Sequence, residues 1–290
     1  MPLISKFDPW SSPLCICPPK LAFNPYTGCD HDCLYCYASS YIPNFQYCRP
    51  KKDLIQRLRQ ETAKLRGETI SISNSSDPYP NIEAEAGLMR TCLETLSNCN
   101  CKVQIITKSP LVVRDSDLLR KMPSMVSMTV TTGDDSIARL IEPQAPPPTA
   151  RLEALKILAQ SGIPTSARID PIIPYLNDET EKLVETLASI GIKHVTSSTY
   201  KVRRDNWQRL CTRMPKLSKK LEPTYFKKGE KIGGYIFLPL EMRTRLLQKI
   251  AASVKENGMR FGVCREGLSY MNTGACDGSW LLSGLVSKLV

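Results

Sequence analysis

The chain has 290 residues, 42% of them hydrophobic, which is enough for one sizeable core and too few for two full domains. A formal net charge of +11 is high for an enzyme of small neutral metabolites and indicates an anionic partner. No run approaches the roughly 18 to 20 apolar residues of a membrane span, and residues 1–10 lack a signal-peptide pattern, so we expect a cytoplasmic protein without a membrane partner.

After an irregular, proline-rich opening, short β-branched runs alternate with amphipathic helical patterns. Gly162 and Gly191 each end a helical pattern just before a strand, which supports the order of helices and strands in this alternation. Candidate strands cover residues 21–24, 69–73, 103–107, 125–131, 165–169 and 194–198. Candidate helices lie between them at about residues 53–65, 83–96, 115–121, 149–160 and 179–190.

This alternation predicts an α/β fold with a parallel sheet. Right-handed connections would curl the six strands into a partial (β/α)6 barrel of the TIM type, with a doubly wound sheet as the alternative. We divide the chain into an N-terminal irregular extension (1–20), a barrel core (21–200), a basic insertion (201–235), and a C-terminal helix followed by a cysteine-containing capping tail (236–290).

The loop after the first predicted strand carries Cys29, Cys33 and Cys36 in a C-x3-C-x2-C spacing. Three thiolates on one loop can each bind a different iron of a [4Fe-4S] cluster and leave the fourth iron without a protein ligand. S-adenosylmethionine (SAM) can chelate that iron, and an electron from the cluster can then cleave SAM to a 5′-deoxyadenosyl radical. The alternatives are a zinc ion with a fourth ligand such as His31, or a chance spacing.

Several features favour the cluster. The aromatic Tyr35 directly precedes the third cysteine, and the loop follows a strand as a barrel-top loop should. No second C-x-x-C pair completes a structural zinc site. The chain has twelve cysteines, and in a reducing compartment such a number indicates metal or thiol chemistry.

From Leu21 to Leu187 the sequence resembles the radical SAM proteins, specifically the branch of spore photoproduct lyase and its "DNA repair photolyase"-like relatives. The loop has Tyr35 and Tyr37 on both sides of the last cysteine, as that family has. The resemblance implies a partial barrel of the radical SAM kind. It also implies that these tyrosines take part in passing the radical.

Later segments extend the resemblance. It implies that Ser76 and Asp77 contact SAM, that Lys108 approaches the SAM carboxylate, and, by a looser alignment, that Thr129 lies near SAM. Each follows or ends a predicted strand, where barrel active sites are built, and SAM needs a cation for its carboxylate and acceptors for its ammonium and ribose. The plainer readings are a turn at Asp77, a solvated Lys108, and packing alone for Tyr37.

The sequence departs from the family at one position. The lyase has a cysteine immediately before its Ser-Asp pair, which returns a hydrogen atom to the product radical, whereas this chain has Ser75. A hydroxyl O–H bond is too strong to quench a carbon radical as a thiol does, so we do not expect the same repair reaction.

Cysteines also occur in the C-terminal tail. Cys264 and Cys276 stand next to or near glycines and polar residues. Glycines let backbone amides approach a ligand or a sulfur atom closely. Each cysteine is a candidate hydrogen-atom donor or a ligand of a second cluster, and the alternative is simple burial.

The segment that begins at Lys201 and ends at Lys231 holds eleven Lys or Arg against three acidic residues. Trp207, Tyr225 and Phe226 lie among these cations, a combination suited to DNA or RNA binding by phosphate neutralisation and base stacking. The alternative is a solvated helical face or a flexible lid.

Three functional classes follow. The first is a radical SAM enzyme of lyase or transferase type that modifies or repairs a nucleic acid and takes electrons from a ferredoxin-type or flavodoxin-type donor. The second is a radical SAM enzyme acting on a peptide, a protein side chain or a small metabolite. The third is a non-catalytic iron–sulfur or zinc protein.

Overall fold

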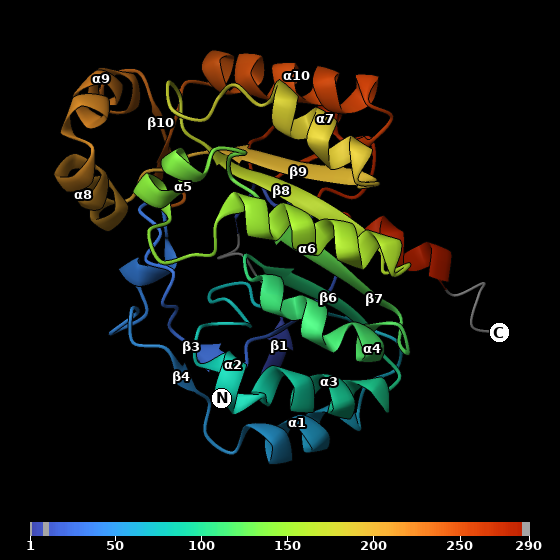
Figure 1. Cartoon of the computed structure of the whole chain (residues 1–290). Helices are drawn as coiled ribbons and strands as arrows, with labels where there is room; N and C mark the ends of the chain where they lie inside the picture. The colour runs from blue at the N-terminus through green and yellow to red at the C-terminus, as the bar shows by residue number, and fades with distance from the viewer. Residues whose placement is uncertain (1, 8–11, 286–290) are drawn as a thin grey trace.

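The computed structural model describes residues 2–7 and 12–285, so parts of the predicted N-terminal extension (1 and 8–11) and tail (286–290) lie outside the described residues. Its centre is an eight-stranded sheet in the order β1-β2-β5-β6-β7-β8-β9-β12 (Figure 1). The edge strand β1 pairs antiparallel with β2, and the other neighbouring strands pair parallel.

The strands of this sheet are β1 (Ile4–Lys6), β2 (Leu21–Phe23), β5 (Thr69–Ile72), β6 (Lys102–Thr107), β7 (Ser124–Thr129), β8 (Thr165–Ile172), β9 (His194–Thr199) and β12 (Arg260–Val263). Two small antiparallel pairs join β3 (Tyr26–Thr27) to β4 (Arg49–Pro50) and β10 (Glu230–Ile232) to β11 (Tyr235–Phe237). The helices are α1 (Leu54–Thr62), α2 (Glu83–Ala86), α3 (Leu88–Ser97), α4 (Ser116–Leu119), α5 (Asp135–Ile141), α6 (Pro148–Gln160), α7 (Glu181–Ser189), α8 (Arg204–Arg213), α9 (Pro215–Phe226) and α10 (Leu240–Glu256). Short 3₁₀ helices cover Ala38–Ser40, Pro110–Asp115, Ser269–Met271 and Ser279–Leu285.

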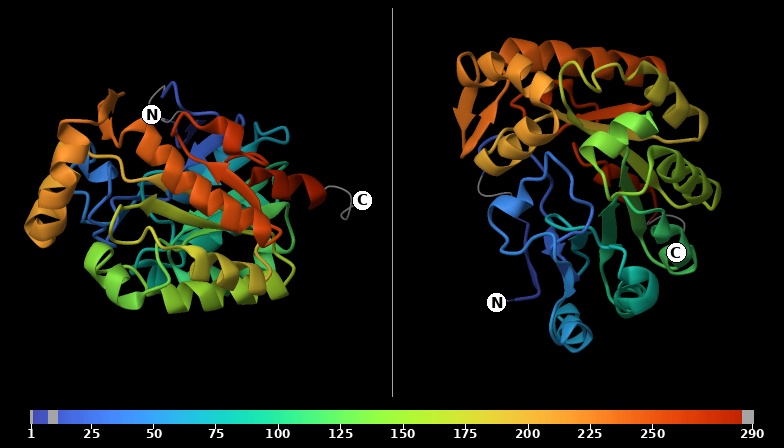
Figure 2. Two further views of the ribbon diagram at one scale, coloured as in Figure 1. Left: turned by 90° about the horizontal axis from the view of Figure 1, so that it is seen from above. Right: turned by 60° about the vertical axis from the view of Figure 1, so that its left-hand side comes forward.

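The helices α1, α3, α4, α6, α7 and α10 lie along the outer side of the curved sheet (Figure 2). A doubly wound sheet would have crossover helices on both faces, whereas a barrel has them outside. The predicted α/β fold with a partial barrel is therefore confirmed. Among residues 2–7 and 12–285, no helix combines the length and the apolar composition needed to cross a membrane.

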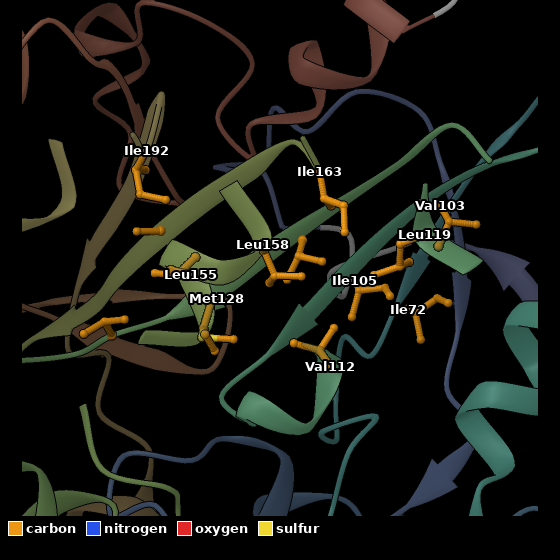
Figure 3. Packing of buried hydrophobic residues seen from close by; sticks show 14 of the residues in the cluster. Ile72, Val103, Ile105, Val112, Leu119, Met128, Leu155, Leu158, Ile163 and Ile192 are labelled. Atoms are coloured by element: carbon orange, nitrogen blue, oxygen red, sulfur yellow. The ribbon is translucent and has the colours of Figure 1, made fainter. Parts of the chain in front are cut away.

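Hydrophobic packing between the sheet and its outer helices forms the main core (Figure 3). Ile105 and Met128 on the strands pack in one cluster with Leu155 and Leu158 of α6, and none of the four is exposed. Removing such side chains from water stabilises the fold by roughly 25 cal/mol per Å².

The alternation along β8 explains both faces of the sheet. Ala167 and Ile169 belong to the outer core, while Arg168 and Asp170 between and beside them line a cavity on the inner side. A strand with period two therefore supplies one apolar and one polar face.

The basic insertion folds as α8, α9 and the β10–β11 hairpin around a second core. Leu210, Leu221 and Tyr225 of the insertion pack with Leu34 and Ile141 from the barrel. Tyr225 is 1% exposed and its hydroxyl donates to the Tyr200 carbonyl, so the expectation that it stacks on bases is wrong for this residue.

The C-terminal tail lies on the inner side of the sheet. Asp277 pairs with Lys20 at 2.5 Å, and its carbonyl accepts from the Gln104 amide at 2.9 Å. Farther along, the Trp280 indole donates to His194 Nδ1 at 3.1 Å. His194 opens β9, so this part of the tail lies toward the N-terminal ends of the strands and forms a floor beneath the cavity.

Candidate functional site

A cavity of about 480 Å³ opens on the inner side of the sheet, within the roughly 300–1,000 Å³ typical of small-molecule sites. Every residue that the sequence indicated as a candidate cluster ligand, SAM contact, radical-passing tyrosine or hydrogen-atom donor lines it: Cys29, Cys33, Tyr35, Cys36, Tyr37, Ser76, Asp77, Lys108, Thr129, Cys264 and Cys276. The chain therefore brings together residues that are up to 247 positions apart, from Cys29 to Cys276.

The cysteine loop (residues 28–40) begins at a position that only glycine fits. Gly28 has φ +83°, and a Cβ there would lie 2.5 Å from the carbonyl oxygen of Phe45. The next amide, that of Cys29, donates to the same carbonyl at 2.8 Å. The Cys36 amide donates to the Cys33 carbonyl at 3.1 Å and closes the loop between the second and third cysteines.

The thiols of this loop suit a cationic metal cluster. Cys29 and Cys33 are each 9% exposed, and burial raises the pKa of both thiols. Ionising three buried thiols without a compensating cation is unfavourable, and bound metal supplies that cation. Within residues 2–7 and 12–285, no three Cys, His, Asp or Glu side chains converge on one metal position. A cubane cluster does not need three ligands at one metal position, because each of its three protein-bound irons takes one thiolate.

His31, the other candidate ligand of the loop, is turned toward a carboxylate. It is 2% exposed, and its Nδ1 lies 3.7 Å from Asp77 Oδ2. Burial lowers the pKa of this imidazole. The arrangement fits a side chain that orients the loop.

Asp77 joins the end of β5 to the end of β6. Its Oδ1 accepts from the Thr107 hydroxyl at 2.7 Å and from the Tyr79 amide at 2.9 Å, and its Oδ2 accepts from the Lys108 amide at 2.8 Å. The bond from the Tyr79 amide shows that Asp77 also stabilises the turn that follows it. The Ser76 hydroxyl donates to the Tyr26 carbonyl at 3.3 Å.

A buried charge network lies behind the loop. Arg151 Nη1 and Glu142 Oε2 are 2.6 Å apart with both side chains fully buried, and Lys108 Nζ lies 4.0 Å from Glu142 Oε1. Burial opposes the ionisation of Glu142, but Arg151 and Lys108 outweigh it and lower the Glu142 pKa. The Tyr35 hydroxyl donates to the same carboxylate. Glu142 and Arg151 were not among the site residues predicted from the sequence, and their role as a pair emerges from the fold.

Tyr37 is held on the other side of the loop. Its hydroxyl donates to the Asn74 carbonyl at 2.5 Å, and its ring stacks on Tyr41 with centroids 6.4 Å apart. Nearby, the buried Ser73 hydroxyl also lines the cavity and has no hydrogen-bond partner among the described residues. A buried donor that faces a cavity is typically satisfied by a ligand or water.

One wall of the cavity contains two charged residues of β8 that were not predicted. Arg168 Nη2 lies 2.6 Å from Asp170 Oδ2, and the Ser198 hydroxyl donates to Asp170 Oδ1 at 2.5 Å. Cys264 lies beside Arg168, which lowers the thiol pKa against the larger raising effect of burial. The polar residues at alternate positions of β8 were the sequence signal that could have identified this wall.

Cys276 has a neighbour that sequence spacing could not reveal. Its Sγ lies 3.6 Å from Cys17 Sγ, and both residues line the cavity. The two cysteines are 259 positions apart, so only the folded chain brings them together.

The insertion also contributes to the cavity. Lys201 Nζ lies 2.6 Å from Glu266 Oε1, and Tyr235 is 4% exposed with a hydroxyl that has no partner among the described residues. The Arg203 and Arg265 guanidinium groups both pack on the Tyr235 ring, at 4.8 and 5.0 Å from its centroid.

Comparison with family models gives one match that covers most of the chain: the model of the radical SAM superfamily matches residues 23–207. An uncharacterised protein of Methanocaldococcus jannaschii is 34% identical over 174 residues, which cover 58% of this chain and 66% of that protein. The radical SAM Nalpha-GlyT isomerase of Pseudomonas phage M6 is 23% identical, over 59% of this chain and 37% of the isomerase. The matched regions thus span less than two thirds of these relatives.

Solved structures show the same fold. Spore photoproduct lyase in complex with dinucleoside spore photoproduct superposes with a TM-score of 0.64 at 16% identity, over 82% of this chain and 74% of the lyase. A lyase variant with bound AdoMet and the same dinucleoside gives 0.65 at 14% identity, over 88% and 79%. Streptococcus suis SuiB bound to S-adenosylmethionine gives 0.55 at 15% identity, over 83% and 49%.

Proposed function

Because the chain belongs to the radical SAM superfamily, we propose that it is an enzyme that applies radical SAM chemistry to a nucleic acid. The resemblance drawn from the sequence is confirmed, and the cofactors are a [4Fe-4S] cluster and SAM, as predicted. The substrate, the roles of individual residues and the reaction type are the proposal.

Cys29, Cys33 and Cys36 would hold the cluster, since they share one buried loop at the cavity wall. When bound, the cluster and SAM together supply a 5′-deoxyadenosyl radical that can abstract hydrogen from an unactivated carbon. A ferredoxin-type or flavodoxin-type protein would supply the electron.

Four side chains would orient SAM. Lys108 provides a cation for the SAM carboxylate, and Ser76, Asp77 and Thr129 line the same part of the cavity. Burial lowers the pKa of the Lys108 ammonium, but the negative charges of a Cys33 thiolate and of the Glu142 carboxylate outweigh it and raise the pKa, which favours the charged lysine. Tyr35 and Tyr37 flank the third cysteine with both hydroxyls bonded to the protein, so their first task is to hold the loop.

We propose Cys264 and Cys276 as the hydrogen-atom donors, a role that the Ser75 hydroxyl cannot fill. All three line the cavity, and the S–H bond of a thiol is the weaker one. A substrate radical that takes the hydrogen atom from Cys276 leaves a thiyl radical 3.6 Å from Cys17, whose thiol lies in position to exchange with it.

One observation carries the nucleic-acid substrate: the insertion has a basic outer surface and an inner side that reaches the cavity. Lys201 and Tyr235 line the cavity. The exposed cations without an acidic partner among the described residues are Arg204, Lys216, Lys219, Lys220, Lys227, Lys228 and Lys231. The dinucleoside bound by the similar lyase supports this substrate class. A base in a duplex would have to be flipped out to enter the cavity, so a single strand or loop is the easier target.

The test is anaerobic reconstitution with iron, sulfide and SAM, followed by reduction in the presence and absence of single-stranded DNA or RNA. We expect about four irons per chain and 5′-deoxyadenosine whose yield rises with the nucleic acid. Cys33→Ala should lose both the iron and the product. Four irons in a Cys264→Ala, Cys276→Ala variant would argue against a second cluster. A yield of 5′-deoxyadenosine that is the same with and without DNA or RNA would count against the nucleic-acid substrate.

A further inference from the structure

Helix α8 lies directly against the cysteine loop, as Figure 1 shows. Its side chains donate hydrogen bonds to three successive carbonyl oxygens of that loop. Arg209 Nε donates to the Leu34 oxygen at 3.2 Å, Asn206 Nδ2 to the Tyr35 oxygen at 3.3 Å, and Arg209 Nη2 to the Cys36 oxygen at 2.6 Å. One helix of the basic insertion therefore supplies hydrogen-bond donors to the backbone carbonyls at and just before the third cysteine.

Two further contacts join the same surfaces. The Ser39 hydroxyl donates to Asp205 Oδ2 at 2.6 Å, and Arg213 Nη2 lies 2.6 Å from Asp32 Oδ2. The four α8 positions 205, 206, 209 and 213 recur at helical spacing, so they form one face of the helix. This face meets the loop at residues 32, 34, 35, 36 and 39.

We propose that Arg209 is a positioning residue whose guanidinium fork fixes the cysteine loop in the conformation that binds the cluster. The inference goes beyond the proposed substrate and rests only on the proposed ligand role of Cys29, Cys33 and Cys36. It assigns the insertion a task in the cofactor site that its charge alone did not suggest.

The shape of the side chain carries the argument. The Leu34 and Cys36 oxygens are two residues apart, and the two nitrogens of one rigid, planar group reach both. A lysine ammonium is a single point of donation on a flexible stem and cannot hold two carbonyls at once in a fixed geometry. Asp205 Oδ2 orients the guanidinium through Nη1 at 3.2 Å.

The consequence for the loop follows from peptide geometry. In a trans peptide the carbonyl and the amide N–H point in opposite directions. Holding the Leu34 and Cys36 carbonyls toward α8 therefore turns the Tyr35 and Tyr37 amides away from it. Groups that orient metal ligands without touching the metal typically change metal affinity by 10- to 100-fold when they are removed.

The experiment measures iron release. Reconstituted wild type, Arg209→Lys and Arg209→Gln are exposed anaerobically to a ferrous chelator without SAM or nucleic acid, and the rate of iron loss is recorded with the electron paramagnetic resonance spectrum of the reduced cluster. Arg245→Gln on the exposed side of α10 is the matched control for the loss of one arginine. Thermal unfolding of each iron-free protein reports whether the variant folds.

We expect both Arg209 variants to release iron about tenfold faster than wild type and to show an altered spectrum, with Arg245→Gln unchanged. If Arg209→Lys matches wild type, charge suffices and the fork proposal is overturned. If neither Arg209 variant folds, Asp205→Asn is the second test, because it weakens the carboxylate contact that orients the Arg209 guanidinium. Wild-type release in that variant also overturns the proposal. Iron retained by Cys33→Ala would instead refute the ligand assignment.

Discussion

Arg151 and Glu142 form an ion pair in which both side chains are wholly excluded from solvent. Breaking such a pair by removing one partner leaves an uncompensated charge in a low-dielectric interior, which is more costly than losing an exposed pair. The pair also matters for the site, because Glu142 accepts from the Tyr35 hydroxyl and lies near Lys108.

The first prediction tests that pair. Arg151→Leu should lower the free energy of unfolding by about 3–5 kcal/mol, because Glu142 is then buried without its guanidinium partner. Glu142→Gln combined with Arg151→Leu should recover part of the loss. Urea denaturation measures each variant, and Lys156→Leu, exposed on the same helix, should stay within about 0.5 kcal/mol of wild type. Equal losses in the single and double variants would contradict the ion-pair account.

At the residue scale, the site divides into what local sequence could predict and what it could not. Cys29, Cys33 and Cys36 are identified by spacing within one loop, and the residues proposed to contact SAM follow or end strands. Cys17 and Tyr235 reach the cavity only through the fold, from opposite ends of the chain. No local pattern encodes such distant contacts.

Among the elements, each of the six predicted strands corresponds to a strand of the sheet, because their β-branched runs are buried on the outer face. Strand β12 was not predicted, since its four residues include a glycine and only one β-branched side chain. In α8 and α9 the dense charge suggested a solvated surface. Yet Leu210 and Leu221 in these helices form a buried core with the barrel.

The tail provides the prediction at this scale. Burial lowers the pKa of His194 to about 4, and the neutral ring accepts from the Trp280 indole of the tail at 3.1 Å. In the unfolded chain this histidine takes up a proton near pH 6.5, whereas in the folded chain it stays neutral until about pH 4. The unfolded state therefore binds more protons between these values, and stability falls as pH drops through this window.

Between pH 7.5 and 5 we expect wild type to lose about 2 kcal/mol more stability than His194→Gln, which has no proton to bind at this position. Urea denaturation at the two pH values gives the difference between the variants. Effects of acid on the rest of the molecule are common to both proteins. Parallel losses would show that His194 is already protonated or solvent-accessible in the folded chain.

For the whole molecule, the barrel was predictable because alternating strands and helices with right-handed connections leave few topologies. The placement of charge was not. Of the eleven cations in the insertion, five contact side chains or carbonyls of the protein, namely Lys201, Arg203, Arg209, Arg213 and Lys220, and the remaining six are exposed on the outside. The sequence alone could not separate these two groups.

That separation gives the last prediction. Lys216, Lys219 and Lys227 are exposed on or beside α9, and none has an acidic partner in the part of the chain that the structure describes. Each lysine that neutralises a phosphate of a single strand contributes about 0.7 to the slope of log affinity against log salt concentration. Replacing all three with Gln should therefore weaken binding to single-stranded DNA or RNA and reduce the slope by about 2.

The control keeps the net charge of that variant but moves the change elsewhere: Gln at Lys52, Lys64 and Lys121, which are exposed on the barrel. Fluorescence anisotropy with a labelled oligonucleotide from low to physiological salt measures both. If the insertion is the nucleic-acid interface, only the α9 variant loses affinity for the oligonucleotide, because phosphates contact those lysines alone. If both triple variants lose affinity equally, the attraction arises from net charge over the whole molecule and the insertion is not the nucleic-acid interface.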